Sequence, residues 1–67
     1  MNNIYPPHIQ RIIDEAGELY EKIKKLDAFI KDNPIFKEQS AIDQQLMKRQ
    51  LTVMKEYLEI LDMRLVF

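Results

Sequence analysis

Apolar side chains recur every three or four positions along most of the chain. In the first half they form one unbroken series of Ile9, Ile12, Ala16, Leu19, Ile23, Leu26 and Ile30. This spacing is typical of a helix that packs along one seam against another helix. Charged residues of both signs occupy the positions between them, as expected for faces that meet water. The pattern predicts a helix from about residue 7 to residue 31, with Pro7 in the first turn, where a missing backbone donor costs nothing.

The second half of the chain carries two neighbouring apolar series. The first is Met47, Leu51, Met54, Leu58, Leu61 and Leu65, and the second is Leu46, Val53, Tyr57, Ile60 and Phe67. The first series predicts a helix over about residues 41–66, with Ser40 as its N-cap and Tyr57 in the core. Two series cover more surface than one antiparallel neighbour can bury, so we expect part of this helix to contact another chain.

Residues 32–40 connect the two predicted helices. The residue before Pro34 disfavours helical backbone, and we expect Ile35 and Phe36 to fold back over the end of the hairpin. The fold class is therefore all-α. We predict a single domain over residues 1–67, an antiparallel two-helix hairpin that assembles into a helical homo-oligomer.

The length of the chain also favours self-association. Ordering 67 residues costs on the order of 100 kcal/mol, at roughly 1.5 kcal/mol per residue, which a two-helix core rarely offsets alone. The chain has no cysteine and one histidine, so neither disulfides nor a His-rich metal site can supply the missing stability. Gly17 costs about 1 kcal/mol relative to alanine inside a helix. We expect another helix to approach closely there, and a ligand that contacts the bare backbone is the alternative.

Charge and hydropathy narrow the function classes. Ten basic and eleven acidic residues give a net charge of −1, which argues against a general nucleic-acid binder that works through counterion release. No apolar run is long enough for a membrane span, and Met1-Asn2-Asn3 lacks the basic and apolar regions of a signal peptide. We expect a cytoplasmic protein with neither a membrane nor DNA as partner.

Few residues could carry catalysis. Ser40 and Thr52 are the only small hydroxyls, and no base lies near either in the sequence. Acidic pairs such as Asp14 and Glu18 could hold a divalent ion, but metal sites in helical bundles usually add histidines at helical spacing. We expect a protein that is not an enzyme and that has no metal and no cofactor.

One polar line on the first predicted helix could bind an anion. Its members, each three or four residues from the last, are His8, Arg11, Glu15, Glu18, Lys22, Lys25 and Phe29. A solvated face with Glu18 paired to Lys22 is one interpretation. In the other, Tyr5 or His8 stacks on a base. Arg11, Lys22 or Lys25 from another protomer would then contact phosphate.

Many of these positions resemble those of a known family. The run His8-Ile9-Gln10-Arg11-Ile12-Ile13-Asp14-Glu15, followed by Leu19, Leu26 and Phe29-Ile30, is similar to the first helix of small phage hairpin proteins of the anti-CBASS cyclic-nucleotide sponge family. The second half is also similar, through Phe36, Gln50, Met54, Tyr57, Leu61 and Arg64 in that order. The resemblance extends from about residue 8 to residue 67.

The resemblance implies a function and a partner. Members of the family are compact homohexamers that bind cyclic oligonucleotide messengers of bacterial antiviral synthases without cleaving them, and so keep the effector inactive. It implies a cyclic dinucleotide between neighbouring protomers, stacked on the aromatic position at His8 or Tyr5. The phosphate-contacting lysine would be Lys22, or Lys24 or Lys25 in another register. Arg64 would serve a separate cyclic trinucleotide site. The chain is thus expected to be a phage anti-defence protein in the host cytoplasm.

A second hypothesis is an interaction module, a dimeric four-helix bundle that docks a protein or a structured RNA. Its basis is the second apolar series, which could equally receive a foreign helix. Light scattering separates the two hypotheses. We expect a hexamer, as the sponge family implies, whereas a stable dimer would favour the interaction module.

Overall fold

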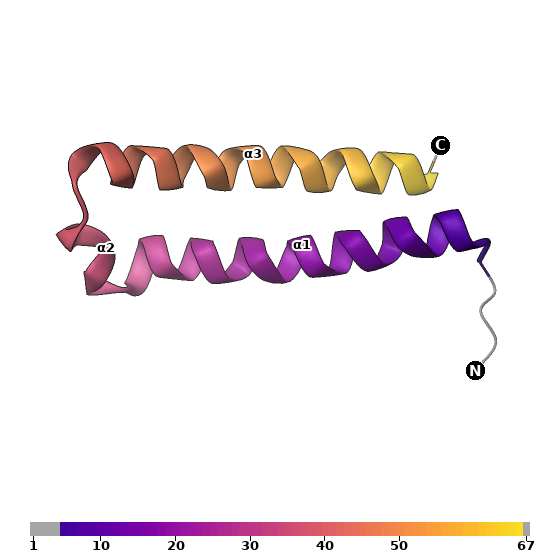
Figure 1. Cartoon of the computed structure of the whole chain (residues 1–67), viewed down its shortest axis with the longest axis horizontal. Coiled ribbons are helices and arrows are strands. Elements are labelled where there is room, and N and C mark those ends of the chain that lie inside the picture. The colour runs from indigo at the N-terminus through magenta and orange to yellow at the C-terminus, as the bar shows by residue number, and fades with distance from the viewer. Residues whose placement is uncertain (1–4, 67) are drawn as a thin grey trace.

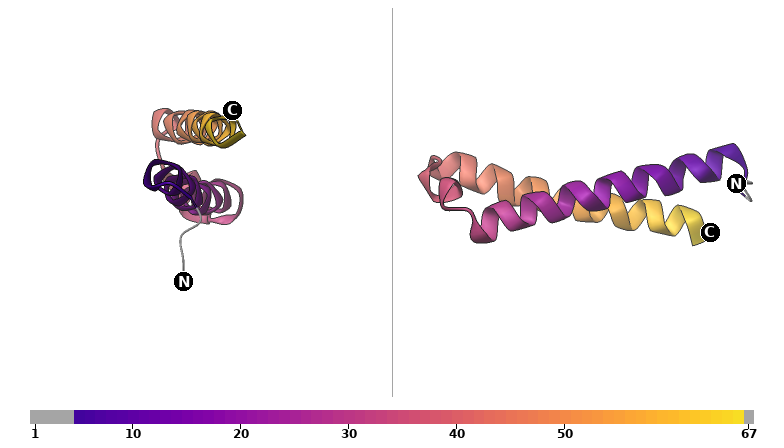
Figure 2. Two further views of the ribbon diagram at one scale, coloured as in Figure 1. Left: turned by 90° about the vertical axis from the view of Figure 1, so that its right-hand side faces the viewer. Right: turned by 90° about the horizontal axis from the view of Figure 1, so that it is seen from below.

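The computed structural model describes residues 5–66, and its regular structure is helical throughout. The helices are α1 (Pro7–Asp32), α2 (Pro34–Glu38) and α3 (Ala41–Val66). Helices α1 and α3 run antiparallel and pack on each other, while the short α2 closes one end (Figure 1). Figure 2 shows the two long helices crossing each other along the hairpin. The predicted all-α antiparallel hairpin is confirmed.

The core lies along the predicted seams of α1 and α3. Its buried members are Ile12, Leu19, Ile23, Leu51 and Leu61, and the residues packed around them are Ile9, Ala16, Leu26, Ile30, Met54 and Leu58. Every residue of the α1 seam predicted from the spacing belongs to this cluster. Leu61 has no exposed surface, whereas Leu65, predicted on the same seam, is exposed because it lies near the end of α3.

The closed end contains a short helix where the sequence predicts only a connection. Asn33 has extended backbone, and its side-chain oxygen accepts a hydrogen bond of 2.9 Å from the Ile35 N–H. Phe36 is buried and meets Phe29 edge to face, with ring centroids 6.2 Å apart. Ile35 is exposed instead, so the prediction that both side chains cover the hairpin end is wrong for Ile35. Neighbouring residues of a helix point about 100° apart, so the two cannot share one contact.

The start of α3 is held by the predicted cap. The Ser40 hydroxyl accepts a hydrogen bond of 3.1 Å from the Asp43 N–H, and the Ser40 carbonyl accepts one of 2.9 Å from the Gln44 N–H. The Gln44 side-chain amide also donates to the carbonyl of Gln39 at 3.0 Å. These bonds satisfy polar groups at the junction of α2 and α3, which holds the closed end in one arrangement.

The second apolar series of α3 lies outside the hairpin core. Its members in the described range, with the neighbouring Ile42, are between 40% and 72% exposed, namely Ile42, Leu46, Val53, Tyr57 and Ile60. The prediction of an unburied second series is confirmed for these residues, and Phe67 lies outside the described residues. The prediction that Tyr57 is in the core is wrong, because the residue lies about 100° around α3 from the seam residue Leu58. No helix within residues 5–66 is long and apolar enough to cross a membrane.

A substitution at Gly17 tests whether another helix packs on this position. Its backbone is that of an ordinary helix, and an added Cβ would meet nothing within 4 Å, so the expected close approach does not occur within the hairpin. Gly17→Ala should raise the free energy of unfolding by about 0.5–1 kcal/mol, because alanine loses less backbone entropy on folding. Urea denaturation measures this, with Ala28→Gly on the same helix as the reverse control. A destabilised Gly17→Ala variant would instead indicate a second chain packed on this position.

Candidate functional site

The six residues predicted to bind a ligand are all exposed, and they are spread over the hairpin. Tyr5 precedes α1, Arg64 lies in the last turn of α3, and the others lie along α1, namely His8, Arg11, Lys22 and Lys25. At 1.5 Å per residue, Lys22 is about 21 Å from His8 along the axis of α1. A pocket of about 1,000 Å³ is only about 12 Å across. One compact site within a single hairpin therefore cannot include both His8 and Lys22.

His8 and Arg64, by contrast, come together at the open end of the hairpin, where the start of α1 meets the end of α3 (Figure 1). They line a shallow depression of about 540 Å³ whose remaining wall residues are Ile9, Ile12, Ile60 and Met63. The depression is thus mostly apolar, with an imidazole and a guanidinium at its edge. Such a surface can hold a flat ring against its apolar part while the guanidinium contacts an anionic group.

Both helix ends are positioned by their sequence. Pro6 and Pro7 begin α1, and the Pro6 carbonyl accepts hydrogen bonds of 3.0 Å from the N–H groups of Ile9 and Gln10. His8 therefore stands in a defined first turn. Arg64 lies in the last turn of α3, where the helix dipole favours a cation. Both side chains thus stand in terminal turns of regular helices, which places them at the open end of the hairpin.

A cross-helix hydrogen bond lies beside this depression. The Tyr57 hydroxyl donates to the Glu15 carboxylate, which joins α3 to α1 across 42 positions of sequence. This bond is the main cause that raises the pKa of Tyr57 above its ordinary value of 10.0; the charge of Glu15 also raises it, and the charge of Arg64 lowers it.

The Tyr57–Glu15 bond also sets which faces of the two helices lie on the same side. Residues three, four or seven apart share a helix face. Glu15 therefore shares a face of α1 with Arg11 and Lys22, and Tyr57 shares a face of α3 with the exposed Ile60. Because the two are bonded, Arg11 and Lys22 of α1 lie on the same side of the hairpin as the exposed apolar series of α3.

The cations of the predicted site have no ion-pair partner in the part of the chain that the structure describes. Ion pairs there join Lys24 to Glu21 at 3.9 Å and Lys31 to Asp27 at 3.1 Å. The pairing of Glu18 with Lys22, which the solvated-face interpretation expects, is not formed. Within residues 5–66, no carboxylate oxygen lies within 4.0 Å of the cationic nitrogens of Arg11, Lys22, Lys25 and Arg64. These charges are therefore free to meet an anionic ligand.

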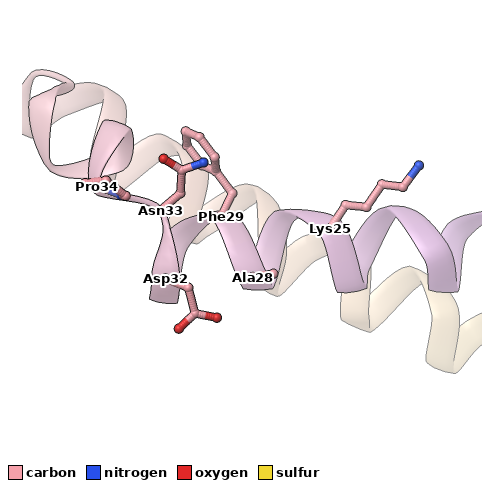
Figure 3. Close-up of a pocket in the computed structure, with 6 residues that line it drawn as sticks. All are labelled: Lys25, Ala28, Phe29, Asp32, Asn33 and Pro34. Atoms are coloured by element: carbon pink, nitrogen blue, oxygen red, sulfur yellow. The ribbon is translucent and has the colours of Figure 1, made fainter.

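Lys25 lines a different depression at the closed end, about 520 Å³ in volume, together with Ala28, Phe29, Asp32, Asn33 and Pro34. Figure 3 shows the Lys25 side chain extending away from the Phe29 ring, while Asp32 points to the other side of the helix. The polar groups of this depression do not converge on one point. A single hairpin offers no compact anion site here.

Two acidic residues of α1 accept hydrogen bonds from different side chains. Asp14 accepts a hydrogen bond of 2.9 Å from the Gln10 side-chain amide, and Glu15 accepts one from Tyr57. No group of three or more histidine, cysteine, aspartate or glutamate residues that could hold a metal comes together within the described residues. Two members of the acidic pairs considered for a metal, Asp14 and Glu15, thus each accept a hydrogen bond from a different side chain.

Comparison with known proteins identifies one family. The model of the family described as Sequestin matches residues 6–67, which include α1, α2, α3 and both edge residues of the open-end depression. The match confirms the resemblance to the cyclic-nucleotide sponge family. No curated protein and no solved structure matches the chain.

The Tyr57–Glu15 bond should make the stability of the fold depend on pH. Because the pKa of Tyr57 is raised in the folded chain, the stability that the bond contributes is present below the unfolded pKa and is lost as pH rises through the folded pKa. Glu15→Gln should lower the pKa of Tyr57 towards its ordinary value, because the charged acceptor is gone. Tyrosinate absorbance measures the titration, and Tyr57→Phe assigns it among the three tyrosines. Identical titrations in the parent and Glu15→Gln would contradict the bond.

Proposed function

Since the chain belongs to the Sequestin family, whose name denotes a sequestering protein, we propose that it is a phage anti-defence protein that binds cyclic oligonucleotide second messengers. It holds cyclic di- or trinucleotides without cleaving them, in the cytoplasm of the host. The bound messenger cannot reach the bacterial antiviral effector. The observation that carries this proposal is the convergence of His8 and Arg64 over an apolar floor in a chain of this family.

The chemistry of the open end suits such a ligand. A cyclic oligonucleotide combines flat bases with phosphates that each carry one negative charge. The imidazole of His8 can stack on a base. Arg64, which the resemblance assigns to a separate cyclic trinucleotide site, lines the same depression as His8, and its guanidinium can bind a phosphate there through two parallel hydrogen bonds. Tyr5, which is half exposed just before α1, is the alternative stacking group.

The remaining cations are supplied by other copies of the chain. Lys22 lies about 21 Å from His8 along α1, so a lysine that contacts the phosphate of a ligand stacked on His8 must come from a second protomer. The same holds for Lys24 and Lys25. A closed symmetric oligomer, for which we propose a hexamer, repeats each contact around a ligand whose phosphates also repeat. Arg11, one turn after His8, adds positive charge at the same end.

The interaction-module hypothesis has one observation in its favour, the exposed apolar series of α3. A foreign helix or a second copy of the chain could cover it. The net charge of −1 gives no support to RNA as the partner. Cyclic oligonucleotide binding is therefore the leading function.

Calorimetry with a panel of cyclic di- and trinucleotides tests the proposal. We expect binding by at least one member and recovery of the intact nucleotide after the protein is denatured, because the messenger is held and not hydrolysed. Arg64→Ala should weaken binding about 10- to 100-fold, which corresponds to the roughly 1.5–3 kcal/mol of a charge-assisted hydrogen bond.

Lys55→Ala is the matched control, because Lys55 is an exposed cation about 200° around α3 from Tyr57 and should leave affinity unchanged. The combined variant Lys22→Ala, Lys24→Ala and Lys25→Ala should bind more weakly, and unchanged affinity would remove the lysines from the site. An absence of binding by every nucleotide at tens of micromolar would refute the proposed function.

A further inference from the structure

The exposed apolar series of α3 has an internal symmetry. Leu46, Val53 and Ile60 follow one another at intervals of seven residues, which places them on one face of the helix. Val53 is central, with Leu46 and Ile60 equally far from it on either side. All three are more than half exposed. A face with this symmetry can pack against an identical face that runs in the opposite direction.

The charged residues beside this face favour one relative orientation of two paired α3 helices. Arg49 precedes Val53 by four residues and Glu56 follows it by three. Because Arg49 and Glu56 are seven apart, they lie on the same flank of the apolar face. In an antiparallel pair of α3 helices each Arg49 meets the Glu56 of the second copy, so the ion pair forms twice. A parallel two-fold pair would place this flank of the two copies on opposite sides of the interface, where Arg49 of one copy cannot reach Glu56 of the other.

The surface left open by one hairpin has the size of an interface. The chain exposes 5579 Å², whereas a monomeric globular protein of its mass exposes about 4,500 Å². The excess of roughly 1,100 Å² is comparable with the 800 Å² or so that each partner buries in a standard interface. Tyr57 and Arg49, at the edges of the face, are residue types enriched in interfaces.

From these observations we infer that two copies of the chain pair through antiparallel α3 helices, with Val53 on the two-fold axis. Leu46 of one copy packs on Ile60 of the other, and Arg49 of each copy pairs with Glu56 of its partner. The four long helices then form a bundle in which the apolar series of α3 is covered.

The pairing has a consequence for the open-end depression. Ile60 and Arg64 line that depression, and in this register they face Leu46 and Ile42 of the second copy. The second copy thus supplies a further wall, and the depression is incomplete in a single hairpin. This part of the inference rests on the proposed function, whereas the pairing of α3 does not.

Cysteine cross-linking tests the register, because the chain has no cysteine of its own. Val53→Cys should form a disulfide-linked dimer on mild oxidation, since its two copies meet at the axis. Leu46→Cys alone and Ile60→Cys alone should not, because two copies of either residue are about 21 Å apart in this arrangement and a disulfide needs Cα atoms within about 7 Å. A mixture of these two variants should give a cross-linked heterodimer. Efficient self-linking of Leu46→Cys, or none of Val53→Cys, would overturn the inference.

Charge reversal tests the ion pair independently. Arg49→Glu and Glu56→Arg should each weaken self-association at least tenfold in sedimentation equilibrium, and the double variant should regain it. Lys55→Glu, the same change of charge on the opposite face, should have no effect. Circular dichroism confirms that each variant is still helical. A double variant that associates no better than either single variant would contradict the pairing.

The two proposals fail separately. Cross-linking through Val53→Cys without cyclic nucleotide binding would support the interface and refute the proposed function. Cyclic nucleotide binding without cross-linking in this register would support the proposed function and refute the interface.

Discussion

A hairpin of two helices can bury only one stripe of side chains on each helix, and the rest of this structure follows from that limit. Helix α1 carries one apolar seam, and all of it is packed in the core. Helix α3 carries two, and the second remains in contact with water in a single hairpin. The exposed series is too large and too regular to be incidental surface. It is the surface through which we infer that two copies of the chain pair.

The two long helices have equal lengths, and this creates the open-end depression. Each helix has 26 residues, so the antiparallel arrangement brings the first turn of α1 against the last turn of α3. His8 and Arg64 lie near opposite ends of the chain and still line one depression. The closed end is held differently, by the edge-to-face contact of Phe29 with Phe36 and by the Ser40 cap. That end is a rigid connection, and its polar side chains point apart.

The distances along α1 separate what one copy can do from what requires several. His8 and Lys22 share a helix face but lie about 21 Å apart, which is farther than one small ligand extends. In the oligomer that we propose, each copy would contribute a different part of its surface to each site. Ile60 belongs to the exposed series of α3 and also lines the open-end depression, so the inferred interface lies next to that depression.

The sequence by itself determined the two long helices, the core seam of α1, the Ser40 cap and the surplus apolar series of α3, because each depends on the period of a single helix. It also indicated the family, through residues distributed over both helices. Only the tertiary structure decided that Tyr57 lies outside the core and bonds Glu15, and that Ile35 is exposed. It also decided that Gly17 has no close neighbour in the hairpin. Arg64 lines the same depression as His8, whereas Lys22 is too far along α1 to do so. These outcomes depend on how one helix is rotated and shifted against the other. Spacing along one helix carries no information about that register, which packing across the hairpin sets.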